Sequence, residues 1–429
     1  MKISKGKILK NYIFLFLIFT ILFYPKIIDY SSFTVAKIVV YIVKYIPYTI
    51  APIMIIFLWN YNKMARRFYV CLIIYRLVYF VADIYNGASI NDIKIWFENT
   101  MLIIATVVIL GSAVKANAIR CFSVISTLGN IYILIDVVTQ ILYPDGLGRI
   151  EMYNSFYQAV TWSDSVGFID VDNRLSLFFI FFLFVNLSLQ QILYGKIKNY
   201  IPIFLVLLDT YITWSGTGIS AIIFICMFLL LKKSKIVNKI IDGYWIILIY
   251  IGALLLFVVA QKFNIFRFFI EGILKKDMSL SSRTQIWLFY LNMIKQKPLL
   301  GYGTKNAGAW YHNTAGDTWY AHNQMLDILV QGGLLAMFLF CIVIVVVKSN
   351  VDRIKDIYIK GLFSVCLLAY FIVGIAEHFL VNKNLCFYGF LCMGFCINDL
   401  YISDRAREKK KFRIKRKIVL KRNGRKDCM

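Results

Sequence analysis

Apolar stretches of about 20 residues recur along the whole chain, and this repetition limits the fold more than any other feature of the sequence. About 20 apolar residues are what a helix needs to cross the hydrocarbon core of a bilayer. Hydrophobic residues make up 60% of the 429 residues, whereas soluble domains contain about half. A chain with this composition is expected to be an all-α polytopic membrane protein.

We predict about twelve membrane-spanning helices from these stretches. Their ranges are 12–30, 33–60, 68–85, 95–114, 121–143, 175–194, 200–214, 217–231, 243–261, 323–347, 361–380 and 384–401. The second range contains Pro47 and Pro52, so we expect a kink or a tilt there, because proline interrupts helical hydrogen bonding. The seventh and eighth ranges are short and are separated by residues 215–218, which permits two half-length spans or one span and a re-entrant piece.

The basic residues predict the direction of the spans. Lys and Arg number 48 against 23 acidic residues, for a formal net charge of +25. With the N-terminus inside, 32 of those 48 basic residues fall in cytoplasmic pieces. Cytoplasmic loops carry an excess of Lys and Arg, so both termini are predicted to lie in the cytoplasm. The basic N-terminus followed by residues 12–24 is interpreted as a signal-anchor that is not cleaved.

The tail over residues 402–429 holds 13 Lys and Arg residues. Two interpretations are nucleic-acid binding and attachment to anionic lipid headgroups. The tail follows a predicted span directly and lacks interleaved aromatic residues apart from Phe412, which favours lipid. We therefore expect no nucleic-acid partner.

Two loops on the side opposite the termini are long enough to carry function. They divide the chain into four parts: residues 1–261, which are spans one to nine with the first loop at 144–174; the large loop 262–322; spans ten to twelve over 323–401; and the tail 402–429. We expect the catalytic chemistry in loop 262–322, which should contain short helices.

Arg283 is the first candidate in that loop. It follows Ser281-Ser282, a hydroxyl pair suited to a helix N-cap, and precedes an apolar-rich run that Pro298 and Gly301 end. A guanidinium in the first turn of a helix matches phosphate oxygens and adds to the attraction of the free N–H groups. The alternative is an arginine that anchors an interfacial helix to lipid headgroups.

His322 is the second candidate. It stands with Asn323 at the outer end of the tenth span, and the other histidines are His312 and His378. Histidine is the side chain best matched to proton transfer near neutral pH. The alternative is an interfacial residue that caps a helix.

Charged residues inside spans need partners, because a bilayer does not solvate them. Arg76 and Asp83 are seven residues apart on one predicted helix and are expected to pair with each other or with a neighbouring helix. Asp209 and Asp327 are interpreted in the same way, as buried structural partners.

An ordered set of short motifs occupies residues 282–334. They are Ser282-Arg283-Thr284-Gln285-Ile286-Trp287, Pro298-Leu299-Leu300-Gly301-Tyr302-Gly303, His322-Asn323 and Gln331-Gly332-Gly333-Leu334. The set resembles the O-antigen ligase and polymerase superfamily, whose large extracytoplasmic loop carries Arg–Trp, Pro-x-x-Gly-x-Gly and His-Asn elements before the next span. Gly167-Phe168 followed by Asn173 is similar to a looser Gly-Phe…Asn element of that family.

The chain also departs from the family. Where the family often has Ser-Arg in its middle spans, this chain has Thr213-Trp214-Ser215-Gly216-Thr217-Gly218 and no arginine. A phosphate site with two arginines therefore cannot be assumed, and Arg149 or Arg174 would have to supply a second cation. Gln331 stands where an acidic residue is common.

The resemblance implies a membrane glycosyltransferase at the outer face of the cytoplasmic membrane. A polymerase of this kind joins undecaprenyl-diphosphate-linked repeat units into a capsular, O-antigen or exopolysaccharide chain. The reaction needs a cation for the diphosphate leaving group and a base beside the acceptor hydroxyl. Arg283 suits the first need and His322 the second. Such chemistry can run without a metal ion, and the sequence shows no cluster of metal ligands, so no cofactor is expected.

Two other functions stay open. An O-antigen-type ligase would move a finished glycan onto lipid or the cell wall; the composition, rich in Ile, Lys, Asn and Tyr, suggests a low-GC bacterium and disfavours a lipopolysaccharide ligase. A flippase for lipid-linked oligosaccharides would show internal repeats and broken helices. No repeat is visible, but the break at residues 215–218 keeps this alternative.

The expected substrate-binding residues accompany the catalytic pair. They are Arg149, Asn173, Arg174, Thr217, Trp287, Tyr302, Gly303 and Asn323. The expected partners are an undecaprenyl-diphosphate-linked oligosaccharide, membrane lipids, a chain-length-regulating copolymerase and a flippase.

Overall fold

The computed structural model describes residues 8–9, 11–30, 34–154, 159–170, 172–232, 234, 283–304, 321–375, 377–378, 380 and 385–402. The predicted ninth span at 243–261, His312 and most of the basic tail lie outside the described residues.

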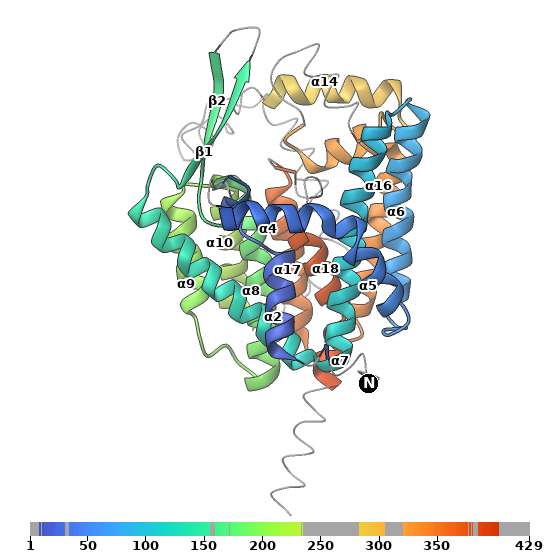
Figure 1. Ribbon diagram of the computed structural model, residues 1–429. Coiled ribbons are helices and arrows are strands. Elements are labelled where there is room, and N and C mark those ends of the chain that lie inside the picture. Colours follow the sequence, from blue (N-terminus) through green and yellow to red (C-terminus); the bar gives the residue numbers. More distant parts are fainter. Residues whose placement is uncertain are drawn as a thin grey trace, which may run out of the picture.

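Helices make up most of the described chain (Figure 1). They are α2 (Tyr12–Leu22), α3 (Ile27–Tyr30), α4 (Thr34–Tyr45), the short η1 (Ile46–Tyr48), α5 (Ile50–Leu58), α6 (Arg66–Tyr85), α7 (Ile90–Leu142), α8 (Asp172–Tyr194), α9 (Ile201–Ile212), α10 (Gly216–Leu231), α14 (Arg283–Gln296), α16 (Gln324–Val351), α17 (Ile357–Val373) and α18 (Leu385–Phe395).

Four of these helices are long and apolar enough to cross a membrane by themselves: α6, α7, most of α8, and α16. A fifth span results if the bent pair Lys37–Tyr48 and Ile50–Leu58 counts as one. Several shorter apolar helices accompany them, so the chain is a helical membrane protein, and the layout of twelve spans stays a prediction.

The predicted kink in the second span is confirmed. The helices on either side of residue 49 differ in direction by 50°, and Pro47 lies in η1 directly before the bend. Figure 1 shows α4 running across the bundle before α5 turns along it. The bend has the expected cause, because a proline cannot donate the hydrogen bond that would continue the first helix.

The fourth and fifth predicted spans form one continuous helical stretch, α7, with a break instead of a loop. Its 53 residues contain one residue with non-helical backbone angles, Asn117. A straight helix of that length would measure about 80 Å, far more than a bilayer is thick. The break falls inside the predicted connection at 115–120, so α7 divides into two helical parts where the sequence predicts a loop.

The first outer loop contains strands, so the prediction of a purely helical chain is wrong there. Strands β1 (Gly148–Asn154) and β2 (Ala159–Val166) form an antiparallel hairpin in which Gly148 pairs with Val166 and Asn154 with Ala159. Both strands carry β-branched and aromatic residues such as Ile150, Val160 and Trp162, which favour extended structure.

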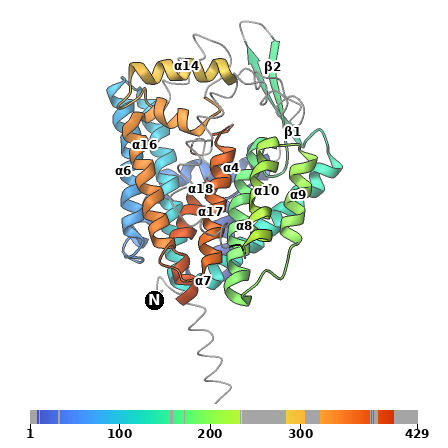
Figure 2. The same ribbon diagram turned by 180° about the vertical axis from the view of Figure 1, so that it is seen from behind.

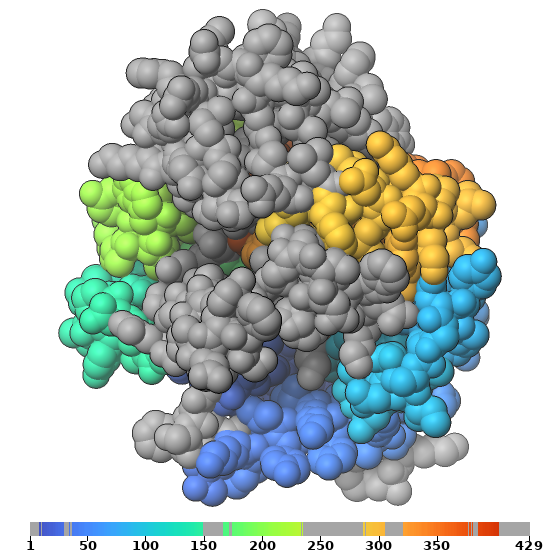
Figure 3. Space-filling view, turned by 90° about the horizontal axis from the view of Figure 1, so that it is seen from above, coloured from blue at the N-terminus to red at the C-terminus, as the bar shows by residue number. Residues whose placement is uncertain are grey.

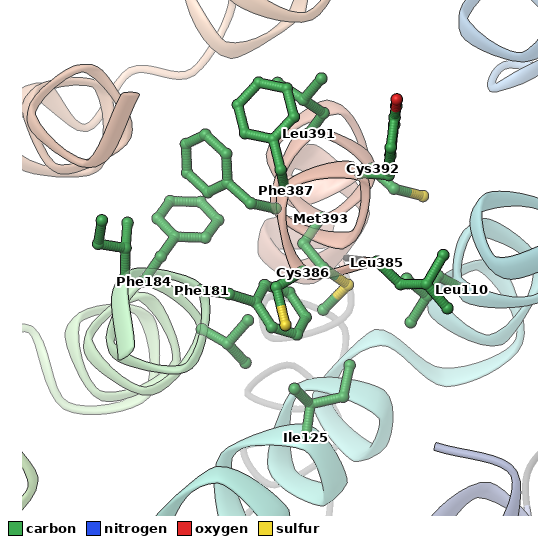
Figure 4. Packing of buried hydrophobic residues seen from close by; sticks show 14 of the residues in the cluster. Leu110, Ile125, Phe181, Phe184, Leu385, Cys386, Phe387, Leu391, Cys392 and Met393 are labelled. Carbon is green, nitrogen blue, oxygen red and sulfur yellow. The ribbon is translucent and has the colours of Figure 1, made fainter. Parts of the chain in front are cut away.

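The apolar core lies where α18 fits between α7 and α8. Figure 4 shows Phe387 of α18 near Phe181 and Phe184 of α8, with Leu110 and Ile125 from the two halves of α7 on the other side. One stacked aromatic pair, Phe363–Phe390, and one edge-to-face pair, Tyr370–Phe387, extend this core to α17. Such close packing is what holds helices together in a bilayer, where burial of apolar surface brings little gain.

The two predicted outer regions lie at the same end of the bundle. The hairpin β1–β2 and helix α14 stand at one end, and the start of α2 lies toward the other, as Figure 1 shows; Figure 2 shows the hairpin and α14 at the same end from behind. This arrangement agrees with the predicted topology, in which both loops face away from the N-terminus.

Candidate functional site

Helix α14 begins at Arg283 and ends at Gln296, as the sequence predicts. It lies across the end of the bundle. Its Trp287 and Tyr290 are buried against Leu326 and Val330 of α16. One face of α14 is therefore packed on protein, which fixes the position of the helix start that carries Arg283.

The Pro-x-x-Gly-x-Gly segment after α14 pairs with a break in α16. The break lies at Gly333, whose φ is 65° and ψ is −167°. On one side of it, Tyr302 N–H donates to Val330 O at 2.7 Å and Gly303 N–H to Gln331 O at 2.9 Å. On the other side, two backbone N–H groups of α16 donate to the carbonyl oxygens of Pro298 and Leu299. We call this backbone pairing the seam.

The seam depends on glycine at two positions. A Cβ atom on Gly333 would lie 2.1 Å from Leu299 O, and one on Gly301 would lie 2.4 Å from Val330 O. Both residues also have positive φ, which glycine adopts at little cost. The glycines of the family motif thus bring two backbones into direct contact.

Side chains at the end of α6 also bind the segment after α14, at residues 301–304. Asp83 accepts hydrogen bonds from Thr304 N–H at 2.7 Å and from Thr304 Oγ1 at 2.9 Å. Asn86 Nδ2 donates to Gly301 O at 3.1 Å. Asp83 therefore binds the segment after α14 at Thr304 and does not pair with Arg76. Arg76 donates from Nε to Thr100 Oγ1 of α7. The expectation that these span charges find buried partners is confirmed, with partners on other elements.

His322 sits where the chain enters α16, in an unusual backbone conformation. Its φ is 48°, the left-handed region. Asn323 caps α16, because its Oδ1 accepts from Met325 N–H and Leu326 N–H. His322 is half-buried, so it lies at the surface of the packed bundle rather than inside it.

A segment after α17 is joined to the start of α16. Asn323 Nδ2 donates to Ile375 O at 3.1 Å, Gln324 N–H donates to Gly374 O at 2.8 Å, and Leu380 N–H donates to Gln324 Oε1 at 2.9 Å. These bonds place His378 next to His322.

Arg174 and His322 both act on His378. Burial of the His378 imidazole lowers its pKa well below the ordinary value, and the charge of Arg174 and that of His322 lower it further. His378 is therefore neutral at pH 7, and Arg174, near the start of α8, belongs to the same cluster as the two histidines. We call Arg174, His322 and His378 the Arg–His cluster.

The start of α10 lies against the start of α8. Ser215 caps α10 by accepting from Gly218 N–H, and a Cβ atom on Gly218 would be 3.4 Å from Ser176 Cβ. Thr217 is half-buried in this first turn. Thus Thr217 and Arg174 come from neighbouring helix starts. Figure 3 views this end of the molecule, with the yellow-green α9 and α10 on one side and the gold α14 on the other.

The turn after β2 is fixed on α7. Ile169 N–H donates to Asp136 Oδ1 at 2.7 Å. A Cβ atom on Gly167 would meet Gln140 Nε2 at 2.3 Å, so the Gly-Phe element lies directly on these two polar side chains. Gly167 is therefore required for the same reason as Gly301 and Gly333, because there is no room for a Cβ atom.

Several predicted site residues have a structural role in addition to any role with substrate. Trp287 donates from Nε1 to Ala321 O at 2.9 Å. Tyr302 is buried and its hydroxyl donates to Gln296 Oε1 at 3.0 Å, while Gly303 lies in the seam. Burial also raises the pKa of the Tyr302 phenol. Their predicted contact with substrate stays a prediction.

Three predicted residues are placed by their backbone alone. Arg283 opens α14, Arg149 lies in β1 opposite Ser165, and Asn173 is in the first turn of α8. In the parts of the chain that the structure describes, no three His, Cys, Asp or Glu residues are grouped as metal ligands would be.

Sequence reasoning named Asp327 and His378 without giving them a place in the site. Asp327 Oδ1 accepts from Ala321 N–H at 2.9 Å, and Asp83 binds Thr304. The available signal was the presence of acids in apolar helices, which require partners. The sequence alone does not predict which backbone N–H group each acidic side chain binds.

Comparison with known proteins agrees with the motifs. Residues 201–341 match the O-Antigen ligase family. A protein of Rickettsia felis with the name "Putative polysaccharide ligase" is 24% identical over 201 residues, which cover 43% of this chain and 47% of that protein. Similarly named proteins of Rickettsia conorii and Rickettsia typhi are 23% and 26% identical, over 43% of this chain and 47% and 48% of their own lengths. The match thus spans about half of these relatives.

The matched family and the related proteins confirm the resemblance to the O-antigen ligase and polymerase superfamily. The family range includes α9, α10, α14, the seam and the start of α16. It ends before His378, so the second histidine of the Arg–His cluster comes from outside the matched range.

Proposed function

We propose that this protein transfers a glycan from a lipid diphosphate carrier to a hydroxyl group of an acceptor, at the end of the bundle that carries α14. The superfamily supports a membrane enzyme that acts on lipid-linked glycans. The start of α14 and Arg174 in the Arg–His cluster offer positive charge to the diphosphate of such a substrate.

The observation that carries the proposal is the setting of His322. The imidazole belongs to a half-buried residue at a helix start, and the segment joined to that start carries the buried His378. Imidazole is the side chain best matched to accepting a proton near neutral pH. A base of this kind would take the proton of the acceptor hydroxyl as it attacks the anomeric carbon.

The diphosphate leaving group needs positive charge as its bond to the sugar breaks. Arg283 is proposed for this role because it opens α14, where free N–H groups add to the guanidinium. Arg174 is proposed as the second cation in preference to Arg149, since its charge acts on His378. The undecaprenyl diphosphate carrier itself belongs to the proposal.

These side chains supply the base and the cations that the transfer needs, and we propose that it does not depend on a metal ion. Transfer in the presence of excess EDTA should equal transfer without it. A loss that Mg²⁺ or Mn²⁺ restores would contradict this part of the proposal.

The acceptor decides between a polymerase and a ligase. A polymerase would use another lipid-linked repeat unit, and the surface polysaccharide would grow by one unit at each step. The names of the related proteins favour a ligase, which would use a lipid or wall acceptor. On deletion, lipid-linked single repeats should accumulate for a polymerase and long lipid-linked chains for a ligase.

The proposed site is tested with His322→Asn in a deletion strain. Asparagine tolerates the left-handed backbone better than most residues but cannot act as a base near pH 7. We expect the polymer ladder to disappear at normal protein level, and Arg283→Ala to have the same effect. Full-length polymer from both variants would rule out the assigned roles.

The proposed orientation places this end outside the cytoplasmic membrane and both termini in the cytoplasm. Cysteine labelling with a membrane-impermeant reagent tests it, with one cysteine introduced at the exposed Leu299 and another at the exposed Lys63. Only the first should react in intact cells. A flippase is tested separately, because purified protein that transfers glycan in detergent is not a pure transporter.

A further inference from the structure

We infer that Asp327 and Trp287 are positioning residues that hold the backbone of His322 in its left-handed conformation. This inference rests on the proposed function, in which His322 is the base. It concerns how the base is held, and neither residue is proposed to touch the substrate.

Ala321, the residue before His322, is bound on both of its backbone groups. Its N–H donates to Asp327 Oδ1 at 2.9 Å, and its carbonyl oxygen accepts from Trp287 Nε1 at 2.9 Å. Ala321 is fully buried. A buried backbone N–H or carbonyl group without a hydrogen-bond partner destabilises the fold. Asp327 and Trp287 supply these partners at a position that is buried away from solvent.

The two partners come from different elements. Trp287 is on α14, and Asp327 is in the first turn of α16. Both are buried, at 4% and 1% exposure, so neither is free to follow a movement of the chain. The peptide before His322 is therefore fixed by two helices at once.

The residue after His322 is fixed as well. Asn323 bonds through Oδ1 to the start of α16 and through Nδ2 to Ile375 O. His322 is thus held between two anchored neighbours. This matters because a left-handed conformation is unfavourable for a residue with a Cβ atom, and a loosely held histidine would return to an ordinary conformation and move its imidazole.

The role assigned to Asp327 is that of a hydrogen-bond acceptor. The competing explanation is that a negative charge on Asp327 stabilises protonated His322. The two roles differ in what an asparagine side chain does at this position. The Asp327→Asn variant would keep an oxygen that accepts from Ala321 N–H, but it would lose the charge.

The experiment uses full-length protein in detergent, with lipid-linked glycan extracted from the deletion strain as the donor. The variants are Asp327→Asn, Asp327→Ala and Trp287→Phe. Asp352→Ala, which removes an acid at the opposite end of α16, is the control. Each is measured for kcat, KM, the pH profile of kcat/KM and Tm.

We expect Asp327→Ala to lower kcat about 10- to 100-fold with little change in KM, since the buried Ala321 N–H loses its acceptor. Trp287→Phe keeps the ring packing and loses one donor, so kcat should fall about 5-fold. Asp327→Asn should restore kcat to within about 3-fold of the wild type, with an unchanged pH profile. The control should leave kcat unchanged.

Two results would overturn the inference. The first is unchanged kcat in Trp287→Phe together with unchanged kcat in Asp327→Ala. The second is an Asp327→Asn variant as impaired as Asp327→Ala with a displaced pH profile, which would assign the effect to charge. If Asp327→Ala does not fold, Trp287→Phe and Asp327→Asn decide the matter.

The proposed function fails on a different result, which is full activity of His322→Asn. In that case the two positioning residues would have no base to position, whatever their own variants show. Loss of activity in His322→Asn with no effect at Asp327 and Trp287 would retain the proposed function and reject only the inference.

Discussion

The seam at the α14 end and the aromatic core around α18 are held together in opposite ways. In the seam, residues 298–303 meet the break of α16 through backbone N–H and carbonyl groups. In the core, Phe387 and its neighbours meet through side-chain rings, with centroids about 5 Å apart for the pairs Phe363–Phe390 and Tyr370–Phe387.

The difference shows what each region can tolerate. Side-chain packing depends on volume and shape, so a similar side chain can replace another. Backbone pairing at van der Waals contact leaves no room for any side chain at its closest points. The end of the molecule that carries the candidate site is thus built from the less tolerant kind of contact, which suits a site that needs exact geometry.

The largest effect is expected for Gly333→Ala. Its backbone angles lie in a region open almost only to glycine, and a new Cβ atom would collide with Leu299 O. The free energy of unfolding should fall by about 3 kcal/mol or more. Thermal unfolding in detergent measures this loss of stability.

Gly87→Ala is the matched control, because Gly87 also has positive φ but open space around it. This substitution should lower the free energy of unfolding by about 1 kcal/mol. Equal effects would show that the close approach in the seam is unimportant.

The next effect is expected in the core. Phe387→Ala leaves a cavity among the rings of Figure 4 and should cost about 3 kcal/mol, whereas Phe387→Leu keeps most of the volume and should cost less than about 1.5 kcal/mol. Thermal unfolding of both variants tests the contrast. A leucine variant as unstable as the alanine variant would mean that the core is as intolerant as the seam.

A smaller effect, which depends on pH, is expected at the end of the molecule that carries the candidate site. The pKa of His378 is lowered in the folded protein, so below about pH 6.5 the unfolded chain binds a proton that the folded chain does not. Stability contributed by neutral His378 is therefore complete above pH 6.5 and is lost as pH falls, by about 1.4 kcal/mol at pH 5.5. Thermal unfolding across pH should show a shallower loss for His378→Gln than for the wild type. An identical slope would contradict the lowered pKa.

The smallest effect is expected for Tyr302→Phe. This change removes the hydrogen bond to Gln296 and keeps the ring and the backbone bonds of the seam. The free energy of unfolding should fall by about 1 kcal/mol. If Tyr302 serves structure alone, KM for the lipid-linked donor stays unchanged. A raised KM would support the predicted contact with substrate.

Much of the helical layout follows from the sequence, because apolar stretches and prolines act locally. The ends of α14 and the bend near Pro47 are examples. The hairpin β1–β2 was not predicted, since its strands lie in a polar loop where alternation of apolar residues is weak and pairing partners are set by the turn. The division of α7 was predicted as a loop and is a break at Asn117.

The candidate site was predicted in part. The Arg283 and His322 motifs are visible in the sequence, and His322 does lie at the start of α16. The reason for the glycines is not visible, because Gly301 and Gly333 are 32 positions apart and meet the other segment only through the fold. The place of Arg174 beside His378 is likewise a contact between α8 and the segment after α17.

The sequence by itself determined that this chain is a helical membrane protein, which superfamily it resembles, and which arginine and histidine are candidates for the chemistry. These properties depend on composition and on motifs within short stretches. Only the tertiary structure brought Asp327 and Trp287 onto Ala321, the residue before His322, and Arg174 into the surroundings of His378. Those contacts join residues from separate helices, and no local pattern specifies them.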